Sequence, residues 1–293
     1  MTRVRRLRGM TSRPPPAAAI AQHYDTLASS RRLSFRQRRA LPTHALRNVQ
    51  NRIKECLIER CGHRTSVYDA CCGRGGDMAK YANHTKPDVV VFADISSESI
   101  AEAKRRYQQH GRALESWKVY FHTMNCFAQG PPLPPVLPFT LIVCNMALHY
   151  AFETKESAAR ALRTLAARLD RARGVLLCTL PDARVLARRS RNFTLREFGN
   201  EYYTVRFIDM PHSQRRAYRF SLQDAVANCI EYVVTENDLA QACDAANLEI
   251  IANESFSSLV ARVPHLMRVY GHLSKSMQDV VTLYRACYIR HKK

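Results

Sequence analysis

Short apolar runs alternate with segments of helical spacing along the stretch from Ser66 to Pro181. The runs are rich in β-branched and aromatic residues, and the longer ones are apolar throughout, as strands buried on both faces of a sheet are. Strands that alternate with helices form parallel sheets, because a parallel connection requires a long crossover. We therefore predict an α/β fold with a doubly wound, mostly parallel sheet. Five of its strands lie at 66–69, 89–94, 117–122, 139–145 and 174–181.

Three other segments have helical spacing. One begins at Ser96 or Ser97, either of which can cap a helix, and ends at Gly111, a residue type that commonly stops helices. The segment 153–169 has the same period. The segment after Pro42 carries an apolar stripe, which consists of Leu46, Val49, Ile53 and Leu57.

Beyond Pro181 the pattern is less regular, and we find neither an internal repeat nor a clear linker. We therefore predict one domain from residue 23 to residue 293, with an insertion at about 188–234 that covers a binding pocket as a small substrate-binding piece. Two of the later strands bring the predicted main sheet to seven. The later elements are a strand after a turn at 198–207, a helix or loop and then a strand at 218–234, a helix and a strand at 235–256, and a closing strand at 280–293.

Composition adds a strong positive charge to this picture. The 293 residues carry a formal net charge of +20 and are 46% hydrophobic. This apolar fraction suffices for a sizeable core, and no run reaches the roughly 18 uncharged apolar residues of a membrane-spanning helix. An excess of positive charge favours polyanions, nucleic acid before an anionic membrane surface. We predict a nucleic-acid partner and no membrane.

Acid-free stretches hold much of this charge. Residues 1–22 are interpreted as a disordered basic arm, with a mitochondrial presequence as the rival interpretation, because both are rich in arginine and lack acids. A secretory signal is not expected, since the apolar patch at 17–21 is short and follows three prolines. Residues 26–54 carry eight cations, which we interpret as phosphate contacts rather than as a solvated face. The stretch 186–191 is interpreted as an exposed helix face, with contact to an RNA backbone as the alternative.

The ten cysteines contain no CxxC pair. The adjacent Cys71 and Cys72 cannot both face one structural zinc without a second pair nearby. We interpret the cysteines as reduced thiols of an intracellular protein and expect no metal; a disulfide framework or a metal site is the alternative.

The stretch 66–80 carries the first chemical signal. A strand ends at Asp69 and is followed by three glycines, which let the backbone approach a ligand closely. A helix expected to open at Asp77 points amide donors at this loop. Asp94 follows Gly73 by 21 residues and ends another strand, the spacing of a carboxylate that binds ribose in a βαβ nucleotide site. We predict a nucleoside site here, with a plain tight turn as the alternative.

Ligands of parallel α/β sheets bind at the carboxyl ends of the strands. We therefore expect the residues at these ends to lie near the pocket. They are Asp69, Asp94, Asn125, Asn145 and Pro181.

Several separated motifs occur along the chain in a joint order and spacing. They are HYD at 23–25, RNVQNRIKECLI at 47–58, DACCGRGGDMAKY at 69–81, ADIS at 93–96, ALHYAFET at 147–154, FGNEYYTVRF at 198–207, CIEYVV at 229–234, and GHLSK and LY at 271–275 and 283–284. Together they resemble the messenger RNA cap guanine-N7 methyltransferases over about residues 23 to 289. The resemblance implies a Rossmann-like methyltransferase fold, S-adenosylmethionine as the methyl donor, and the guanosine cap of RNA as the acceptor.

On the donor side, the resemblance implies Lys54 on the donor's carboxylate, the 71–76 loop against its methionine part, and Asp94 on its ribose. It places Asn125 beside the adenine amino group. The implied donor-binding residues are Lys54, Asp69, Cys71, Gly73, Asp94, Asn125, Asn145 and Tyr150.

On the acceptor side, the resemblance implies His149 and Tyr150 beside the guanine and Glu231 on its Watson–Crick edge. A carboxylate accepts from both N1–H and the exocyclic amine of guanine, which adenine does not offer, so a wrong base leaves a buried charge unsatisfied. The family's basic residues that contact the triphosphate correspond to Arg74, Lys80 and Arg106 of this chain. The implied cap-binding residues are Gln50, Asn51, Arg74, Lys80, Arg106, His149, Glu231 and Tyr284.

The implied reaction does not require a side chain to transfer a proton. Neutral guanine already has a lone pair on N7, and the sulfonium methyl is already activated, so we expect no general base. In-line positioning supplies about 7–11 kcal/mol in well-oriented systems. Glu231 gains a second role, since a fixed carboxylate stabilises the positive charge that grows on guanine, while His149 and Tyr150 orient the base.

The chain departs from the family pattern at five positions. Cys71 stands where the family has glycine, so the approach of the donor is expected to be tighter or differently placed. Met146 replaces an aromatic residue. Gln50 replaces an asparagine, Asn125 an aspartate and Asn145 a glutamine, and each of these three keeps some hydrogen-bonding ability.

Simpler interpretations of the acceptor residues stay open. His149 is alternatively a half-buried histidine, Tyr284 a core residue, and Glu231 an acid that faces solvent. Two other functions also stay open: a methyltransferase with the same donor that acts on a small molecule or a protein, and a non-catalytic RNA-binding partner in a capping complex.

The resemblance also carries expectations about the protein's surroundings. The expected partner is capped RNA, other capping enzymes are an open second class, and the catalytic unit is expected to be monomeric. The family and the basic arm imply a nuclear location, with the cytoplasm, for a viral protein, and the mitochondrion as alternatives.

Overall fold

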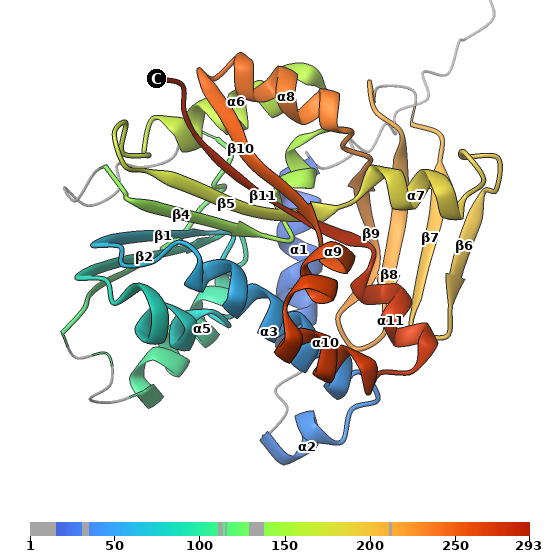
Figure 1. The fold of residues 1–293 in the computed structure, drawn as a ribbon, viewed down its shortest axis with the longest axis horizontal. Coiled ribbons are helices and arrows are strands. Elements are labelled where there is room, and N and C mark those ends of the chain that lie inside the picture. The colour runs from blue at the N-terminus through green and yellow to red at the C-terminus, as the bar shows by residue number, and fades with distance from the viewer. Residues whose placement is uncertain (1–15, 31–34, 111–113, 115, 129–137, 211–212) are drawn as a thin grey trace, which may run out of the picture.

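We examined a computed structural model of the chain (Figure 1), which describes residues 16–30, 35–110, 114, 116–128, 138–210 and 213–293. Residues 1–15 of the predicted basic arm, and the predicted helix stop at Gly111, lie outside this part. Residues 16–22 are not a disordered arm as predicted, because they belong to helix α1 (Pro16–Ser30). This helix packs against α5 (Ser97–His110), a contact between distant segments that composition does not reveal.

Seven strands form the main sheet, which confirms the predicted mostly parallel, doubly wound architecture. Strands β1 to β5 are parallel in the order β5-β4-β1-β2-β3, so the chain moves outward from β1 on one side and from β4 on the other. At the β5 edge, β11 pairs antiparallel with β5, and β10 antiparallel with β11. The strands are β1 (Ser66–Ala70), β2 (Val89–Asp94), β3 (Lys118–Thr123), β4 (Leu141–Asn145), β5 (Val175–Pro181), β10 (Leu248–Ser255) and β11 (Tyr284–His291).

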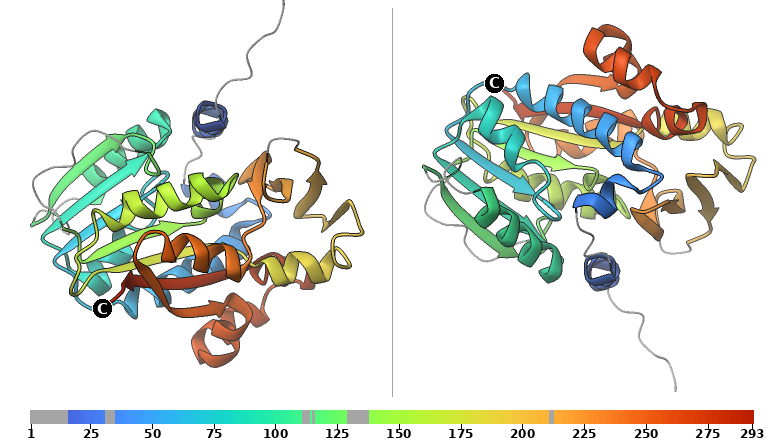
Figure 2. Two further views of the ribbon diagram at one scale, coloured as in Figure 1. Left: turned by 90° about the horizontal axis from the view of Figure 1, so that it is seen from above. Right: turned by 90° about the horizontal axis from the view of Figure 1, so that it is seen from below.

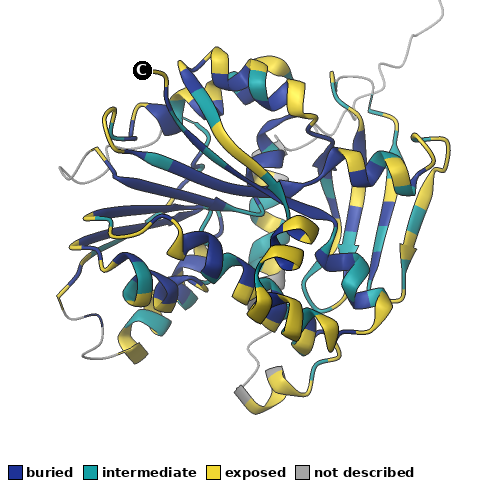
Figure 3. Cartoon of the chain, in the orientation of Figure 1, coloured by how far each residue is buried: buried dark blue, intermediate teal, exposed yellow. Residues whose placement is uncertain are grey.

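The central strands are buried on both faces (Figure 3), as their continuous apolar runs predict. On β1, Val67 packs into the hydrophobic cluster on one side of the sheet and Tyr68 into the cluster on the other, because neighbouring strand residues point to opposite faces. The predicted apolar stripe of α3 is buried in the first cluster. The covering helices are α3 (His44–Glu59) and α5 on one face, and α6 (Lys155–Ala166) and α8 (Glu236–Asp244) on the other.

A second, four-stranded antiparallel sheet lies beside the main sheet (Figure 1) and takes up most of the predicted insertion at 188–234. Each strand pairs with the next along the chain, as in a meander. The strands are β6 (Glu197–Asn200), β7 (Tyr203–Ile208), β8 (Ala217–Leu222) and β9 (Val226–Tyr232).

Two predictions in this region are wrong in detail. The helix or loop predicted at the start of 218–234 is strand β8, in which Tyr218, Phe220 and Leu222 alternate with more exposed residues. This period of two is a strand signal that the sequence displays. The single strand predicted at 198–207 is the hairpin β6–β7, since tight pairing across Asn200 and Tyr203 closes the turn.

Three short helices between β10 and β11 were not predicted. All three contact α3, and they cover it with buried residues such as Leu266 and Val280. The predicted strands on either side of them are confirmed as β10 and β11. The helices are α9 (Phe256–Arg262), α10 (Pro264–Gly271) and α11 (Lys275–Val281).

The basic stretch 186–191 begins in helix α7 (Ala183–Arg189), as predicted. Its expected exposure holds for Arg188 and Arg191 but not for Arg189, whose guanidinium donates to Tyr203 Oη at 2.7 Å. That side chain is taken up by contacts between α7 and the small sheet. A short helix before α3, α2 (Phe35–Arg39), lies in the predicted cationic stretch.

The helix predicted to open at Asp77 is short. Asp77 precedes α4 (Met78–Lys80), which continues as a single π-helical turn, η1 (Tyr81–Thr85). The loop between β1 and α4 passes close to α5. A Cβ atom on Gly75 would lie 2.4 Å from Met78 Cε and 3.2 Å from Ala103 Cβ, and Gly75 also has a left-handed φ of +67°. Only glycine fits this position without strain.

We predict that Gly75→Ala lowers the free energy of unfolding by roughly 2–4 kcal/mol, because the left-handed backbone and the contact with α5 both oppose a side chain. Urea denaturation measures the change. Gly76→Ala is the matched control, since a Cβ at Gly76 would meet no heavy atom within 4 Å. We expect that variant to stay within about 0.5 kcal/mol of the parent. Equal stability of the two variants would contradict the loop geometry.

Candidate active site

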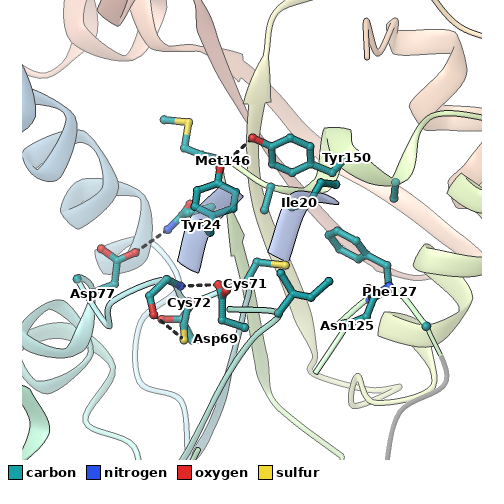
Figure 4. Close-up of a pocket in the computed structure, with 18 of the residues that line it drawn as sticks. Ile20, Tyr24, Asp69, Cys71, Cys72, Asp77, Asn125, Phe127, Met146 and Tyr150 are labelled. Carbon is teal, nitrogen blue, oxygen red and sulfur yellow. Dashed lines mark hydrogen bonds between the residues drawn. The ribbon is translucent and has the colours of Figure 1, made fainter. Parts of the chain in front are cut away.

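Three parallel strands end side by side at one edge of the main sheet, where β1, β2 and β4 bring Asp69, Asp94 and Asn145 together. A cavity of about 550 Å³ lies at this edge (Figure 4), within the usual size range of small-ligand sites. Pro181, a strand-end residue that was expected near the pocket, does not line this cavity. The eight donor-binding residues that the motif resemblance implied all line it. They are Lys54, Asp69, Cys71, Gly73, Asp94, Asn125, Asn145 and Tyr150.

Asp94 is fixed by two backbone donors. Its Oδ1 accepts from the backbone N–H of Ser96 at 2.9 Å, and its Oδ2 accepts from that of Gly73 at 2.8 Å. Burial raises the pKa of Asp94 above its ordinary value, while these hydrogen bonds favour the charged form and limit the rise. The glycine loop and the start of α5 therefore hold one carboxylate in a set orientation at the cavity wall.

Asp77 joins two of the predicted donor residues, and the sequence analysis assigned it no binding role. Its Oδ1 lies 2.8 Å from Lys54 Nζ and 2.8 Å from Lys80 Nζ, and its Oδ2 accepts from Asn145 Nδ2 at 3.0 Å. Burial acts to raise the pKa of Asp77, but the two ammonium groups outweigh it and bring the pKa below the ordinary value. Asp77 thus orients Lys54 from α3 and Asn145 from β4 in the same cavity.

Asp69 lies deeper in the same wall. Burial, with the neighbouring Asp77 carboxylate as a second cause, raises the pKa of Asp69 well above its ordinary value. One of its oxygens, Oδ2, is buried without a hydrogen-bond partner among the described residues. Asp69 as a residue lines the cavity, and the neighbouring Tyr81 phenol limits the rise of its pKa.

Cys71 occupies the loop position where glycine was expected. Its φ is +61°, a left-handed conformation that favours glycine, and its backbone N–H donates to Cys126 Sγ at 3.3 Å. The side chain lines the cavity, so it narrows the space that a glycine would leave. Asn125, on the next loop, is oriented by the backbone N–H of Phe127, which donates to its Oδ1 at 3.0 Å.

Helix α1 supplies two cavity residues to which the sequence analysis gave no role, Ile20 and Tyr24 (Figure 4). They are four positions apart and therefore share a helix face. The Tyr24 and Tyr150 hydroxyl oxygens lie 2.9 Å apart, in a hydrogen bond between residues 126 positions apart in the chain. The sequence analysis noted this segment only as the HYD motif at 23–25. Nothing in the motif predicted the contact between Tyr24 and Tyr150.

Glu231 is buried, so the alternative in which it faces solvent is excluded: 4% of its surface is exposed. Its Oε1 accepts from Tyr150 Oη at 3.2 Å, and its Oε2 accepts from Tyr218 Oη at 2.8 Å. His149 is buried too, and its Nε2 lies 3.4 Å from Glu231 Oε1. The acid, the histidine and Tyr150 thus form one cluster, as the acceptor-side prediction requires.

The acceptor cluster is tightly closed in this conformation. Glu231, Tyr218 and Tyr284 line a cavity of only about 10 Å³, close to the smallest volume that holds one water molecule. A guanine base does not fit there. Tyr284 is buried beside Phe256. In this structure it is packed as a core residue, which is the simpler of its two interpretations.

The phenols of this cluster are held neutral. Burial is the main cause that raises the pKa of Tyr24, Tyr150 and Tyr218 well above the ordinary value, and the Glu231 carboxylate adds to it. Neutral phenols donate hydrogen bonds and do not accept protons from a substrate at physiological pH. In this structure Tyr150 and Tyr218 donate to Glu231.

The predicted triphosphate-binding residues are less open than expected. Lys80 Nζ is bound to Asp77, to the Gly76 carbonyl at 2.9 Å and to Asn51 Oδ1 at 3.3 Å. Arg106 Nε donates to Glu102 at 2.8 Å, and Arg74 is partly buried in the glycine loop. On α3, Asn51 is exposed and Gln50 is partly buried. None of these five residues lines the 550 Å³ cavity.

Among the described residues, no group of three or more His, Cys, Asp or Glu side chains is arranged to hold a metal ion. Within the same ranges, every helix is too short or too polar to cross a membrane.

Comparisons with known proteins agree with this geometry. A family model for the mRNA (guanine-N(7))-methyltransferase domain matches residues 13–288. The chain is 30% identical to mRNA cap guanine-N(7) methyltransferase 1 of Oryza sativa subsp. japonica, a match that covers 94% of this chain and 79% of that protein. It is 28% identical to the mRNA cap guanine-N(7) methyltransferase of Schizosaccharomyces pombe, over 89% of this chain and 74% of that protein.

Solved structures show the same fold. The magnesium protoporphyrin IX methyltransferase of Synechocystis PCC 6803 with bound SAH matches with a TM-score of 0.52 and 13% identity, over 95% of this chain and 100% of that one. A S-adenosylmethionine-dependent methyltransferase of Clostridium acetobutylicum matches with a TM-score of 0.52 and 14% identity, over 94% and 99%. The resemblance drawn from the motifs is confirmed: the chain belongs to the mRNA (guanine-N(7))-methyltransferase family and has the fold of S-adenosylmethionine-dependent methyltransferases.

Proposed function

We propose that this protein transfers a methyl group from S-adenosylmethionine to N7 of the guanosine cap of messenger RNA. Family membership supplies the reaction class. Tyr150 carries the proposal for this chain, because its ring lines the 550 Å³ cavity while its hydroxyl donates to the buried Glu231. The acid that would recognise guanine therefore lies directly behind the wall of the cavity that would hold the donor.

The donor fits the charges and donors of the cavity wall. Lys54, already held by Asp77, would pair with the donor's carboxylate, and Asp94 would accept from the ribose hydroxyls with its remaining lone pairs. Asn125 would meet the adenine amino group. The loop at 71–76 would follow the methionine part, with Cys71 as the closest side chain.

The acceptor base requires a rearrangement of the closed cluster. Guanine would replace the Tyr150 hydroxyl on Glu231 Oε1, so that N1–H and the exocyclic amine both donate to the carboxylate. His149 and Tyr150 would then orient the ring. A buried carboxylate that loses a donor is costly unless the incoming ligand supplies another, and adenine cannot supply the same pair.

The chemistry needs no proton transfer in this site. The N7 lone pair attacks the sulfonium methyl, the C–S bond breaks, the donor leaves as a neutral thioether, and the positive charge moves to guanine. Glu231 stabilises that charge, and the neutral Tyr218, which donates to its other oxygen, holds the carboxylate in place. In-line orientation of the three reacting atoms supplies the rest.

The wider setting is part of the same proposal. Capped RNA is the substrate, and the basic residues Arg74, Lys80 and Arg106 would meet its triphosphate after exchange of their present partners. We expect a monomeric catalytic unit in the nucleus, with other capping enzymes as candidate partners. Size-exclusion chromatography tests whether the protein is a monomer, and cell imaging tests whether it is located in the nucleus.

We predict that the purified protein, supplied with S-adenosylmethionine and capped RNA, forms 7-methylguanosine in the cap. Nuclease digestion and mass spectrometry identify the product, and uncapped RNA of the same sequence is the control. Methylation of uncapped RNA, or of neither RNA, would contradict the proposal. Calorimetry with S-adenosylhomocysteine distinguishes a chain that binds the donor product without turnover from one with no donor site.

We predict that Glu231→Gln lowers kcat/KM for cap methylation by about 100-fold or more, because the amide loses the charge and one of two acceptors. The fold and the affinity for S-adenosylhomocysteine should stay near those of the parent, since glutamine keeps the volume of glutamate. Glu201→Gln, which changes an exposed acid of the same small sheet, should leave kcat/KM unchanged. Parent-like turnover by the Glu231 variant would remove this acid from the mechanism.

We predict that kcat/KM for a capped RNA of about 20 nucleotides falls more steeply with salt than kcat/KM for the cap dinucleotide, because positive charge attracts the longer phosphate chain. The formal charge of +20 is the source of this attraction. Plots of log rate against log salt concentration measure both slopes. Equal slopes would show that the RNA beyond the cap does not contact the positive surface.

A further inference from the structure

Helix α1 packs against α5 and contacts β9. In both views of Figure 2 it is seen end-on at the margin of the molecule, outside the stacked sheet and helices. It nevertheless contributes Ile20 and Tyr24 to the 550 Å³ cavity. Its position therefore depends on a few contacts, and these decide whether one wall of the cavity is present.

Asp25 makes the polar contact between α1 and α5. Its Oδ1 accepts from Ser96 Oγ at 2.7 Å and from the backbone N–H of Glu98 at 3.2 Å. The same Ser96 hydroxyl accepts from the backbone N–H of Ser99 at 3.0 Å, so Ser96 rather than Ser97, the other cap that the sequence allowed, is the N-cap. Asp25 thus takes up a second free N–H of this helix start, where a carboxylate is favourable.

The same turn holds the donor-site carboxylate. Ser96 is fully buried, and its backbone N–H donates to Asp94 Oδ1 at 2.9 Å. One residue therefore joins Asp25 through its side chain and Asp94 through its backbone. A shift of α1 would act on the cavity twice, through the loss of the Tyr24 wall and through the turn that orients Asp94.

We infer that Asp25 is a positioning residue for donor binding: it fastens α1 to the first turn of α5, so that Ile20 and Tyr24 close the cavity over a donor held by Asp94. The inference rests on the proposed donor site and adds a residue to which the motif resemblance gave no role. It needs an acceptor oxygen at position 25 more than a negative charge, because both donors to Asp25 are neutral groups.

The test is calorimetric binding of S-adenosylhomocysteine to the full-length chain, without RNA. Asp25→Ala should weaken binding about tenfold, equivalent to about 1.4 kcal/mol. Asp25→Asn keeps an acceptor oxygen and should bind within about threefold of the parent, since asparagine caps helices as well as aspartate does. The KM for S-adenosylmethionine should rise with the Kd, while kcat at saturating donor changes less.

Thr235→Ala is the matched control for loss of a helix cap. Thr235 Oγ1 accepts from the backbone N–H of Asp238 at the start of α8, whose residues do not line the cavity. This variant should lower the melting temperature by an amount similar to Asp25→Ala and leave the Kd unchanged. A comparison of the two therefore separates positioning of the donor wall from general stability.

Three results would overturn the inference. They are an unchanged Kd for Asp25→Ala, a Kd for Asp25→Asn as weak as that of the alanine variant, and an equal loss of affinity in Thr235→Ala. A parent protein that fails to bind S-adenosylhomocysteine would overturn both this inference and the proposed donor site. A protein that binds it, and loses affinity through Asp25→Ala, but does not methylate caps would support this inference and contradict the proposed function.

Discussion

The 550 Å³ cavity exists because three parallel strands end side by side. The order β5-β4-β1-β2-β3 makes the chain leave β1 toward β2 on one side and return to β4 on the other, so their following loops diverge and leave a crevice. Asp69, Asp94 and Asn145 lie at or near these strand ends, and their side chains reach the same cavity.

A buried charge cluster then fixes the wall of that crevice. Burial of Asp77 is unfavourable unless its charge is paired, and Lys54, Lys80 and Asn145 supply that pairing from α3, α4 and β4. The cluster links α3, the helix that directly precedes β1, to β4, which lies on the other side of β1 from β2. The cluster also explains why Lys80, which was expected at a triphosphate, points inward. Its ammonium group pairs with the buried Asp77 carboxylate, as that of Lys54 does, and so offsets part of the cost of burying this charge.

A chain of phenols connects this crevice to the small antiparallel sheet. Tyr24 from α1 contacts Tyr150, Tyr150 donates to Glu231 on β9, and Tyr218 on β8 donates to the other oxygen of the same carboxylate. The proposed donor and acceptor sites are therefore neighbours that share Tyr150. With the closed packing around Glu231, the proposed binding of guanine requires an exchange of hydrogen bonds in this chain of phenols.

The sequence by itself determined the features that depend on local period and spacing. The continuous apolar runs predicted the buried central strands, and the stripe from Leu46 to Leu57 predicted the buried face of α3. The distance from Gly73 to Asp94 predicted a carboxylate beside the glycine loop, where Asp94 accepts from the Gly73 N–H. The motif resemblance added which positions share a pocket. Its donor set lines one cavity, because a methyltransferase fold in the same motif order places those strand ends in the same way.

Only the tertiary structure decided the partners of each side chain. Nothing in the alternation of CIEYVV tells whether Glu231 faces solvent or a cluster of tyrosines, since the outcome depends on η3 (Leu148–Ala151), which packs against β9 from 81 positions earlier. The same holds for Asp77 between two lysines and for Asp25 at the start of α5. The burial and hydrogen bonding of these side chains depend on which distant segments pack against them. The spacing of residues within a segment does not predict which segments those are.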